Sequence, residues 1–197
     1  MDASLNRRNA RKGESMRITG GIYRSRRVQC PPGVIRPAMD RMRESMFSIL
    51  GDIAELSFLD LFTGSGVVGI EAASRGAEPV VLVEKDRRKT PIIRKNISFV
   101  ESPIRLLIQS AERYIATQAS RRDSKFDIIY LDPPFNYEQK IELIRSVARS
   151  GLLAPHGRCL IHHPTPEQWP EHIEQFECSD VRAYGGSTLR FFKWIEA

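Results

Sequence analysis

Short apolar runs alternate with amphipathic segments along most of the chain. The runs are too short for helices and rich in Val, Ile and Leu, which is typical of strands buried on both faces. Between them, apolar residues recur every three or four positions, as on one face of a helix. This alternation predicts an α/β fold with a mostly parallel, Rossmann-like sheet covered by helices. The expected strands are near 57–61, 79–84, 104–108 and 126–131, and the expected helices near 67–75, 87–99, 111–119 and 137–150.

Both ends of the chain depart from this alternation. Turn signals and changes of period predict a small N-terminal β-hairpin and helix, a fifth strand, and a C-terminal antiparallel hairpin. The expected elements are a hairpin over 16–30 bent at Gly20-Gly21, a helix from Asp40 to about Leu50, a strand at 158–161, and strands at 174–183 and 187–195 around Tyr184.

The length of 197 residues and a hydrophobic content of 41% suit a single core. We expect one domain over 16–197, in which 16–50 form a basic extension. Residues 1–15 have too little apolar content for a core and are expected to be a disordered basic tail.

The segment Asp132-Pro133-Pro134-Phe135 follows the apolar run at 126–131. Ligands collect at the carboxyl ends of parallel strands, and two consecutive prolines fix a rigid turn there. The Pro133 carbonyl and Asp132 offer two acceptors, and Phe135 offers a flat apolar face. Together they suit a planar aromatic amine. The alternative is a proline-rich loop in which Asp132 caps the next helix.

A glycine-rich turn follows the strand at 57–61. Gly64, Gly66 and Gly69 have the spacing G-x-G-x-x-G. The first two allow the backbone close to a ligand, and Gly69 allows close packing of helix on strand. Glu84 ends the next strand about 20 residues after Gly64, where an acid binds ribose hydroxyls. Taken alone, this pattern fits nicotinamide and flavin enzymes equally well.

The carboxylate of Asp60 distinguishes between the candidate cofactors. A carboxylate beside the glycine turn would repel the pyrophosphate of a dinucleotide. It suits a ligand with an ammonium group and no phosphate. S-adenosylmethionine (SAM) carries an amino group, a sulfonium and a ribose. Asp60, Glu84 and Asp132 therefore predict a site for SAM beside an amine substrate.

With these motifs, the chain resembles bacterial small-subunit rRNA guanine-N2 methyltransferases of the RsmD type, from Met16 nearly to the C-terminus. The block from Arg36 to Glu44 is specific to that family, whereas the glycine turn and the Asp132 segment are shared with DNA amino-methyltransferases. Many relatives have Tyr where this chain has Phe135. The matching segments are Met16–Arg24, Arg36–Leu50, Asp60–Gly66, Ser74–Ala77, Val83–Glu84, Asn96 and Asp132–Phe135.

The resemblance implies SAM-dependent methyl transfer to the exocyclic N2 amine of a guanine in 16S rRNA, either free or in a small-subunit particle. Asp132 and Pro133 would accept hydrogen bonds from the amine, and Phe135 would stack on the base. Related enzymes often have an acid near the adenine where this chain has Ser110. The implied cofactor-binding residues are Asp60, Gly64, Ser65, Gly66, Glu84, Ser110 and Ala111.

Positive charge is concentrated near the N-terminus. Residues 1–43 hold 11 Lys and Arg against 3 Asp and Glu, a net +8, whereas the whole chain has 30 against 24, a net +6. Arginines interleaved with apolar residues indicate an ordered surface that meets phosphates. A solvated tail is the alternative for 1–15. The expected RNA-binding residues are Arg17, Arg24, Arg26, Arg36, Arg41 and Arg43.

Other signals argue against several classes of protein. No apolar stretch approaches ~18 residues, and no apolar core of a signal peptide follows the basic N-terminus. Cys30, Cys159 and Cys178 are odd in number and far apart, so we expect no metal site, no disulfide, and reduced thiols in the cytoplasm. His162 and His163 are interpreted as structural.

Two alternative functions remain from the residues. A DNA adenine or cytosine amino-methyltransferase could use the same Asp132 segment, but the chain has little room for a separate recognition domain. A non-catalytic Rossmann-like RNA-binding module is disfavoured by Asp60, Glu84 and Asp132 together. Asn96 is open to two interpretations, a substrate contact or a helix cap.

Overall fold

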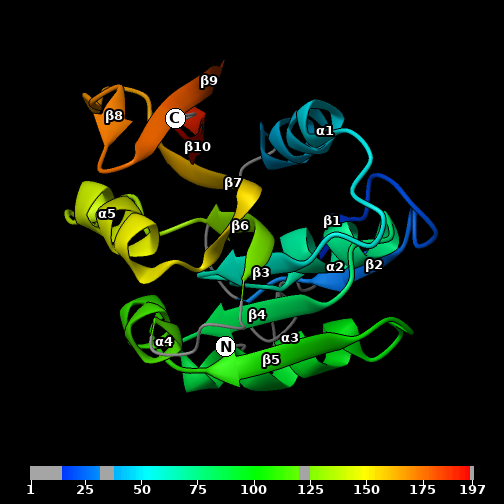
Figure 1. Ribbon diagram of the computed structural model, residues 1–197. Coiled ribbons are helices and arrows are strands. Elements are labelled where there is room, and N and C mark those ends of the chain that lie inside the picture. Colours follow the sequence, from blue (N-terminus) through cyan, green and yellow to red (C-terminus); the bar gives the residue numbers. More distant parts are fainter. Residues whose placement is uncertain (1–14, 32–37, 120–124, 196–197) are drawn as a thin grey trace, which may run out of the picture.

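The computed structural model describes residues 15–31, 38–119 and 125–195. The strands of its main sheet are β3 (Phe58–Leu61), β4 (Val80–Glu84), β5 (Ile104–Ile108), β6 (Phe126–Leu131), β7 (Leu153–Pro164), β8 (His172–Ile173), β9 (Phe176–Tyr184) and β10 (Ser187–Trp194). Their order is β5-β4-β3-β6-β7-β10-β9-β8 (Figure 1). Strands β3 to β7 pair in parallel, and β10 pairs antiparallel with both β7 and β9. The predicted mostly parallel α/β sheet with a C-terminal antiparallel hairpin is confirmed.

Helices cover both faces of the parallel part of the sheet. α2 (Val67–Ser74) and α3 (Thr90–Ile97), which follows the short 3-10 turn η1 (Arg87–Lys89), pack on one face. α4 (Ala111–Gln118) and α5 (Lys140–Ser150) pack on the other. Alternate strand residues point to opposite faces, so Phe58 joins the first core and Leu59 the second. Burial on both faces explains why the strands were nearly continuous apolar runs.

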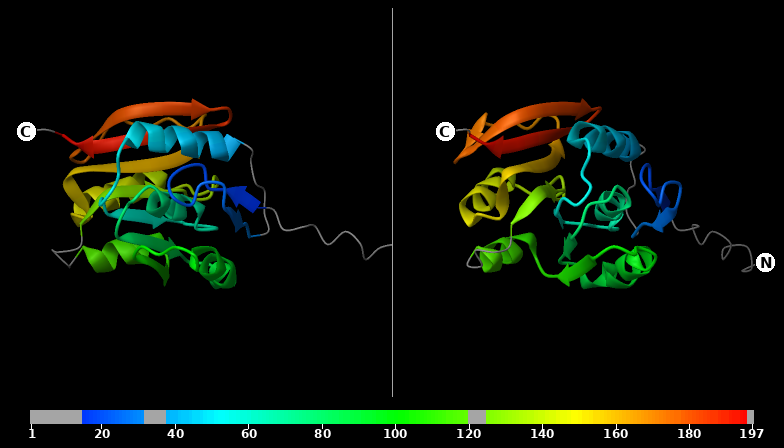
Figure 2. Two further views of the ribbon diagram at one scale, coloured as in Figure 1. Left: turned by 90° about the vertical axis from the view of Figure 1, so that its right-hand side faces the viewer. Right: turned by 45° about the vertical axis from the view of Figure 1, so that its right-hand side comes forward.

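The N-terminal extension packs beside α2. β1 (Ser15–Arg17) and β2 (Arg27–Gln29) form a two-stranded antiparallel hairpin. Its connecting loop binds the end of α2, where the Ser74 carbonyl accepts from the Ile22 amide at 2.7 Å. α1 (Ala38–Leu50) lies along the C-terminal strands (Figure 2), where Tyr184 donates to Ser45 at 2.5 Å.

Several element bounds differ from those expected. The strand predicted at 158–161 is the middle of the longer β7. The helix predicted at 87–99 divides into η1, which Asp86 caps, and α3, which has Pro91 in its first turn. The predicted N-terminal hairpin is confirmed, with shorter strands than its 16–30 range. None of the helices described is both long and apolar enough to span a membrane.

Candidate active site

Four parallel strands end at one edge of the sheet and bring their last residues together. The register pairs Leu61 with both Val83 and Leu131, and Leu131 with Ile161. The residues that follow these positions therefore meet at one place. A cleft of about 440 Å³ opens there. Its lining residues are Met42, Phe62, Gly64, Glu84, Lys85, Asp86, Lys89, Asp132, Pro133, Pro134, Phe135, His162 and Ser187.

The glycine turn between β3 and α2 has the backbone that its residues predict. Gly64 and Gly66 have φ of 61° and 84°, in the left-handed region that side chains disfavour. At Gly69, a Cβ atom would lie 2.2 Å from the Leu82 side chain, so the helix can approach the strand only without one. At Gly66, a Cβ would face the core side chains of Ile93 and Leu82 at 3.5 Å. Gly66 is therefore required by its backbone conformation.

Glu84 joins the glycine turn to the next strand. Its carboxylate accepts from the Gly64 amide at 3.0 Å and from the Asp86 amide at 2.9 Å. Lys89 Nζ lies 3.1 Å from the same side chain. Glu84 is 5% exposed yet lines the cleft, so it presents an acceptor close to backbone that a ligand can approach.

Asp60 lies beneath the turn and does not line the cleft. Its Oδ2 accepts from Thr63 Oγ1 at 2.5 Å and from the Gly69 amide at 3.2 Å, so it holds the turn in shape. Oδ1 is buried without a partner among the described residues. Burial raises the pKa of Asp60 to about 7, helped by the negative charge of Asp132. Direct contact between Asp60 and a cofactor stays a prediction.

The Asp132 segment forms a braced loop after β6. The Asp132 amide donates to the Leu61 carbonyl at 3.2 Å, and the Tyr137 amide to the Pro134 carbonyl at 2.7 Å. No described residue donates a backbone hydrogen bond to the Pro133 carbonyl. Lys140 Nζ donates to the Phe135 carbonyl at 2.8 Å and to the Tyr137 carbonyl at 2.6 Å. A rigid loop with an acid, a carbonyl and an aromatic ring at the cleft can hold a planar amine.

His162 and Lys140 were not predicted as site residues. His162 Nδ1 lies 2.9 Å from Asp132 Oδ1, and its ring packs edge-on against Phe135 at 5.4 Å between centroids. The sequence interpretation of His162 as structural rather than metal-binding did not include this pair. Its signal is present in the sequence, because His162 lies near the end of β7, the strand beside β6 in the sheet. Lys140 gave no comparable signal.

Besides Asp60 and Gly66, three more predicted cofactor residues lie outside the cleft lining. Ser110 caps α4 by accepting from the Arg113 amide at 3.2 Å, and Ala111 is buried beside it. Ser65 is buried in the glycine turn, and its carbonyl accepts from Asn96 at 2.8 Å. Roles for these residues at the adenine stay predictions.

Asn96 has a function that neither sequence interpretation contained. Its amide donates to the Gln29 carbonyl at 2.8 Å and to the Ser65 carbonyl, and accepts from the Gln29 amide at 2.9 Å. Asn96 thus ties the N-terminal hairpin to the glycine turn. It is neither a helix cap nor a residue of the cleft lining.

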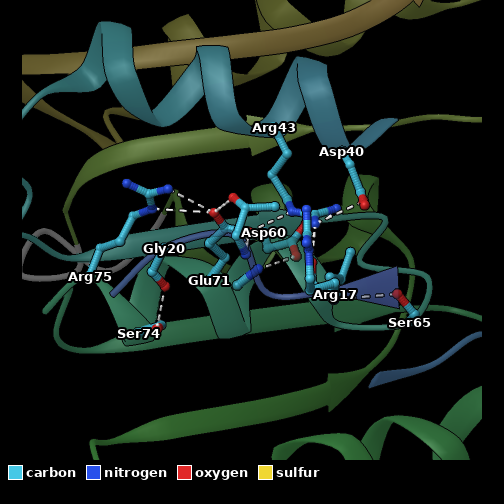
Figure 3. Close-up of polar contacts among 12 residues, drawn as sticks. Arg17, Gly20, Asp40, Arg43, Asp60, Ser65, Glu71, Ser74 and Arg75 are labelled. Carbon is cyan, nitrogen blue, oxygen red and sulfur yellow. Dashed lines mark hydrogen bonds and ion pairs between the residues drawn. The ribbon is translucent and has the colours of Figure 1, made fainter. Parts of the chain in front are cut away.

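Arg43 is a correction to the expected RNA-binding set. It is 1% exposed, and its guanidinium donates to Glu71 at 2.6 Å, to Asp40 at 3.0 Å and to the Arg17 carbonyl. Figure 3 shows Arg43 reaching from α1 toward Glu71 on α2, with Arg75 approaching the same carboxylate from the other side. A guanidinium enclosed in this way cannot meet a phosphate.

The other predicted arginines lie at different places. Arg17, Arg24, Arg26 and Arg41 are exposed, whereas Arg36 lies outside the described residues. Arg26 stacks on the Phe99 ring at 4.7 Å. The loop that carries Arg24 and Arg26 contacts the C-terminal end of α2, about 12 Å of helix away from the glycine turn. Arg41, next to the cleft residue Met42, is nearer the site.

Comparisons with known proteins agree in family and fold. The family described as "Conserved hypothetical protein 95" matches residues 16–193. "Ribosomal RNA small subunit methyltransferase D" of Escherichia coli (strain K12) is 32% identical over 171 residues, covering 81% of this chain and 84% of that protein. The protein of the same name in Haemophilus influenzae is 28% identical over 169 residues, covering 80% and 86%. The solved structure of a hypothetical protein from Thermus thermophilus has 28% identity and a TM-score of 0.78, covering 90% of this chain and 99% of that one.

Proposed function

Because this chain belongs to the RsmD family, described as conserved hypothetical protein 95, we propose that it methylates RNA with SAM as donor, at the N2 amine of a guanine in small-subunit rRNA. The relatives named above carry rRNA methyltransferase names, which supports the class of substrate. The predicted family is confirmed, and the base and the atom methylated are the proposal.

One observation carries the proposal. The cleft joins the glycine turn and Glu84 to the loop of Asp132, Pro133 and Phe135. The first group suits a ribose-containing cofactor, and the second suits a planar amine. Since both line the same cleft, a donor and an acceptor molecule would lie side by side. That proximity is the main requirement of a direct group transfer.

The residues present fit SAM better than a dinucleotide. Glu84, Asp86 and Asp132 line the cleft, and their carboxylates would repel a pyrophosphate. Glu84 can accept from both ribose hydroxyls, and Asp60 Oδ1 is an unpartnered acceptor beneath the turn, as far as the described residues show. When bound, SAM supplies an activated methyl group on a sulfonium. The chain then needs to orient the amine and take up one proton.

The amine side of the cleft can perform both tasks. The lone pair of a guanine N2 amine is delocalised into the ring, which makes it a weak nucleophile. Acceptance of its two N–H bonds by Asp132 and the Pro133 carbonyl favours a pyramidal nitrogen whose lone pair faces the methyl group. Phe135 holds the base by stacking, worth about 1–3 kcal/mol. After transfer, Asp132 is the nearest base for the surplus proton of the nitrogen.

The RNA would approach across α1 and the N-terminal hairpin. Arg41 is exposed beside the cleft residue Met42, whereas Arg24 and Arg26 lie at the far end of α2. Phosphate contacts at both places require an RNA that extends well beyond the target base. The base itself must be unpaired or extruded, because its amine cannot reach the cleft from inside a helix.

Transfer of a labelled methyl group from SAM into small-subunit rRNA, followed by mapping of the modified base, tests this function. We expect label on the N2 atom of one guanine, and loss of nearly all transfer in Asp132→Ala. The assay is run with three substrates: free rRNA, small-subunit particles and double-stranded DNA. Label on DNA, or on an adenine amine, would replace the proposal with an amino-methyltransferase of another class.

Calorimetry with SAM and with NAD tests the cofactor separately. We expect SAM to bind and NAD to give no heat, because the cleft carries carboxylates where a pyrophosphate would lie. Tight binding of NAD without binding of SAM would contradict the proposal, even in a protein that binds RNA.

A further inference from the structure

His162 touches both groups that would hold the substrate amine. Its ring lies at the end of β7 and is 6% exposed. On one side, Nδ1 lies 2.9 Å from Asp132 Oδ1. On another, the ring meets the Phe135 ring edge-on, at 5.4 Å and an interplanar angle of 67°. The acid and the stacking plane are thus oriented by a single side chain from a neighbouring strand.

The chemistry of the pair decides which way the hydrogen bond runs. An ionised Asp132 only accepts, so the ring donates from Nδ1. This engages Oδ1 and leaves the second carboxylate oxygen for the substrate. A carboxylate held at one oxygen cannot rotate freely, which fixes the direction in which the other oxygen accepts.

The second ring nitrogen shows that the histidine is not fully satisfied by the fold. His162 Nε2 is buried and has no hydrogen-bond partner among the described residues. His163 Nε2 is also buried without a described partner, so this atom by itself does not distinguish His162 from a structural histidine. The neighbouring His163 has a different environment, with Nδ1 at 2.8 Å from the Pro164 carbonyl and the ring stacked on Trp169. Successive strand residues point to opposite faces, so only His162 of the two lines the cleft.

We propose that His162 is a positioning residue for methyl transfer: as a neutral Nδ1–H imidazole it holds Asp132 with one oxygen free for the amine, and its edge sets the plane of Phe135. This inference rests on the proposed function, since it names how the same cleft orients its amine substrate. His162 would contact neither the methyl donor nor the reacting nitrogen. It acts through Asp132 and Phe135.

Three substitutions separate positioning from mere packing. In His162→Asn, the side-chain amide nitrogen occupies the place of Nδ1 and can still donate to Asp132. In His162→Gln, the amide reaches the place of Nε2 instead. His162→Leu keeps apolar volume and donates nothing. We expect single-turnover methyl transfer to fall on the order of 100-fold in Leu and Gln, the loss typical of a displaced reacting group, and to recover mostly in Asn.

The binding of SAM, measured by calorimetry, should be the same in all three variants and the wild type. Recovery by Asn but not by Gln supports the proposal, because both amides are similar in size and polarity. A Leu variant that transfers methyl at the wild-type rate would overturn it, as would equal rates in Asn and Gln. Where Leu fails to fold, the comparison of Asn with Gln still decides the question.

A second measurement does not depend on activity. The imidazole ¹⁵N spectrum of the free protein should show His162 protonated at Nδ1, the reverse of the tautomer that free histidine favours, with assignment from the signal lost in His162→Asn. Protonation at Nε2 alone would overturn the positioning proposal even in an active enzyme. If the wild type transfers no methyl to any RNA while the Nδ1–H signal is present, the proposed function fails and the Asp132–His162 contact stands.

Discussion

Lys140 Nζ lies 2.6 Å from Glu167 Oε1, and the same ammonium donates to the carbonyls of Phe135 and Tyr137. Lys140 is 4% exposed, so this cation is enclosed by acceptors supplied by the substrate-side loop and by the segment after β7. The finding links the position of Phe135 to a charge that the loop itself does not contain.

Lys140→Met should loosen that loop. The two carbonyls lose a charged donor, which should lower the free energy of unfolding by about 1–3 kcal/mol. We expect a higher KM for RNA and an unchanged affinity for SAM, because Lys140 does not line the cleft. Urea unfolding and steady-state methyl transfer measure the two effects. A variant as stable as the wild type and with its KM would show that the ammonium is dispensable.

Arg43→Met should be among the most destabilising changes in the N-terminal extension. It removes one partner of a buried pair and leaves Glu71, 0% exposed, with less compensation. A loss of about 3–5 kcal/mol is expected. Arg75→Met is the matched control, since Arg75 binds the same carboxylate but is 26% exposed, and should cost about 1 kcal/mol or less. Equal losses in the two variants would contradict the assigned burial.

Acid should weaken the same contact. Burial alone would raise the pKa of Glu71, but hydrogen bonding from Thr19 and the charge of Arg43 outweigh it and lower the pKa below 4.5. A lowered acid pKa adds stability above the unfolded value and loses it as the pH falls through the folded value. Glu71→Gln should therefore flatten the fall of stability below about pH 4.5.

Asp60 should have the opposite pH dependence. Burial raises its pKa from 3.8 to about 7, so between these values the folded state binds a proton that the unfolded state lacks. Its contribution to stability therefore falls as the pH rises from about 4 to about 7. Asp60→Asn cannot ionise, and its stability relative to the wild type should increase over that range by roughly 1–4 kcal/mol. Unfolding in urea at both limits measures the change, and a constant difference would contradict the raised pKa.

Gly64→Ala and Gly66→Ala should separate binding from folding. Both positions have positive φ, so each substitution should cost about 1–2 kcal/mol. At Gly66, the new Cβ would face the core, whereas at Gly64 it would meet only the Phe62 carbonyl, at 3.9 Å, among the described residues and would enter the cleft. We expect loss of SAM affinity mainly in Gly64→Ala. Calorimetry on both variants measures their affinities for SAM. A larger loss of affinity in Gly66→Ala than in Gly64→Ala would contradict the geometry.

The salt dependence of RNA binding should distinguish the arginines. Arg41→Gln and Arg24→Gln each remove an exposed charge, and each contact with a phosphate should reduce the slope of log K against log salt by about 0.7–0.9. Arg41 lies nearer the cleft, so its loss should also slow methyl transfer. An unchanged slope in both variants would mean that these charges are only solvated.

The order of the inner strands and helices could be predicted because strands such as β3 and β4 are mostly apolar runs buried on both faces. Glu84 and the Asp132 loop were found at the cleft because strand ends collect at one edge. The pairing of His162 with Asp132 could not be read from one segment, because it arises from the register between Leu131 and Ile161.

The position of Arg43 in the sequence already indicated that it is buried, although its charge suggested an exposed residue. It has the helical spacing of Met46, Phe47 and Leu50, which are all buried, so the period already placed it on the apolar face of α1. The assignment of Arg43 to the basic surface rested on its charge and overlooked its position on the apolar face of the helix. A buried arginine needs an acid to compensate its charge, and here that acid is Glu71 in a distant segment. The local sequence pattern around Arg43 does not contain this partner.

The interior place of β10 affects how the protein is made. β10 is synthesised after every other strand of the sheet, yet it lies between β7 and β9 and supplies the cleft residue Ser187. A growing chain can form the parallel strands first, but β9 has no neighbour on its inner side until β10 emerges. Nascent chains interrupted before this strand would expose an unpaired edge of β7, a template for aggregation. The completed cleft thereby marks a chain that has been translated at least through Ser187, the first residue of β10.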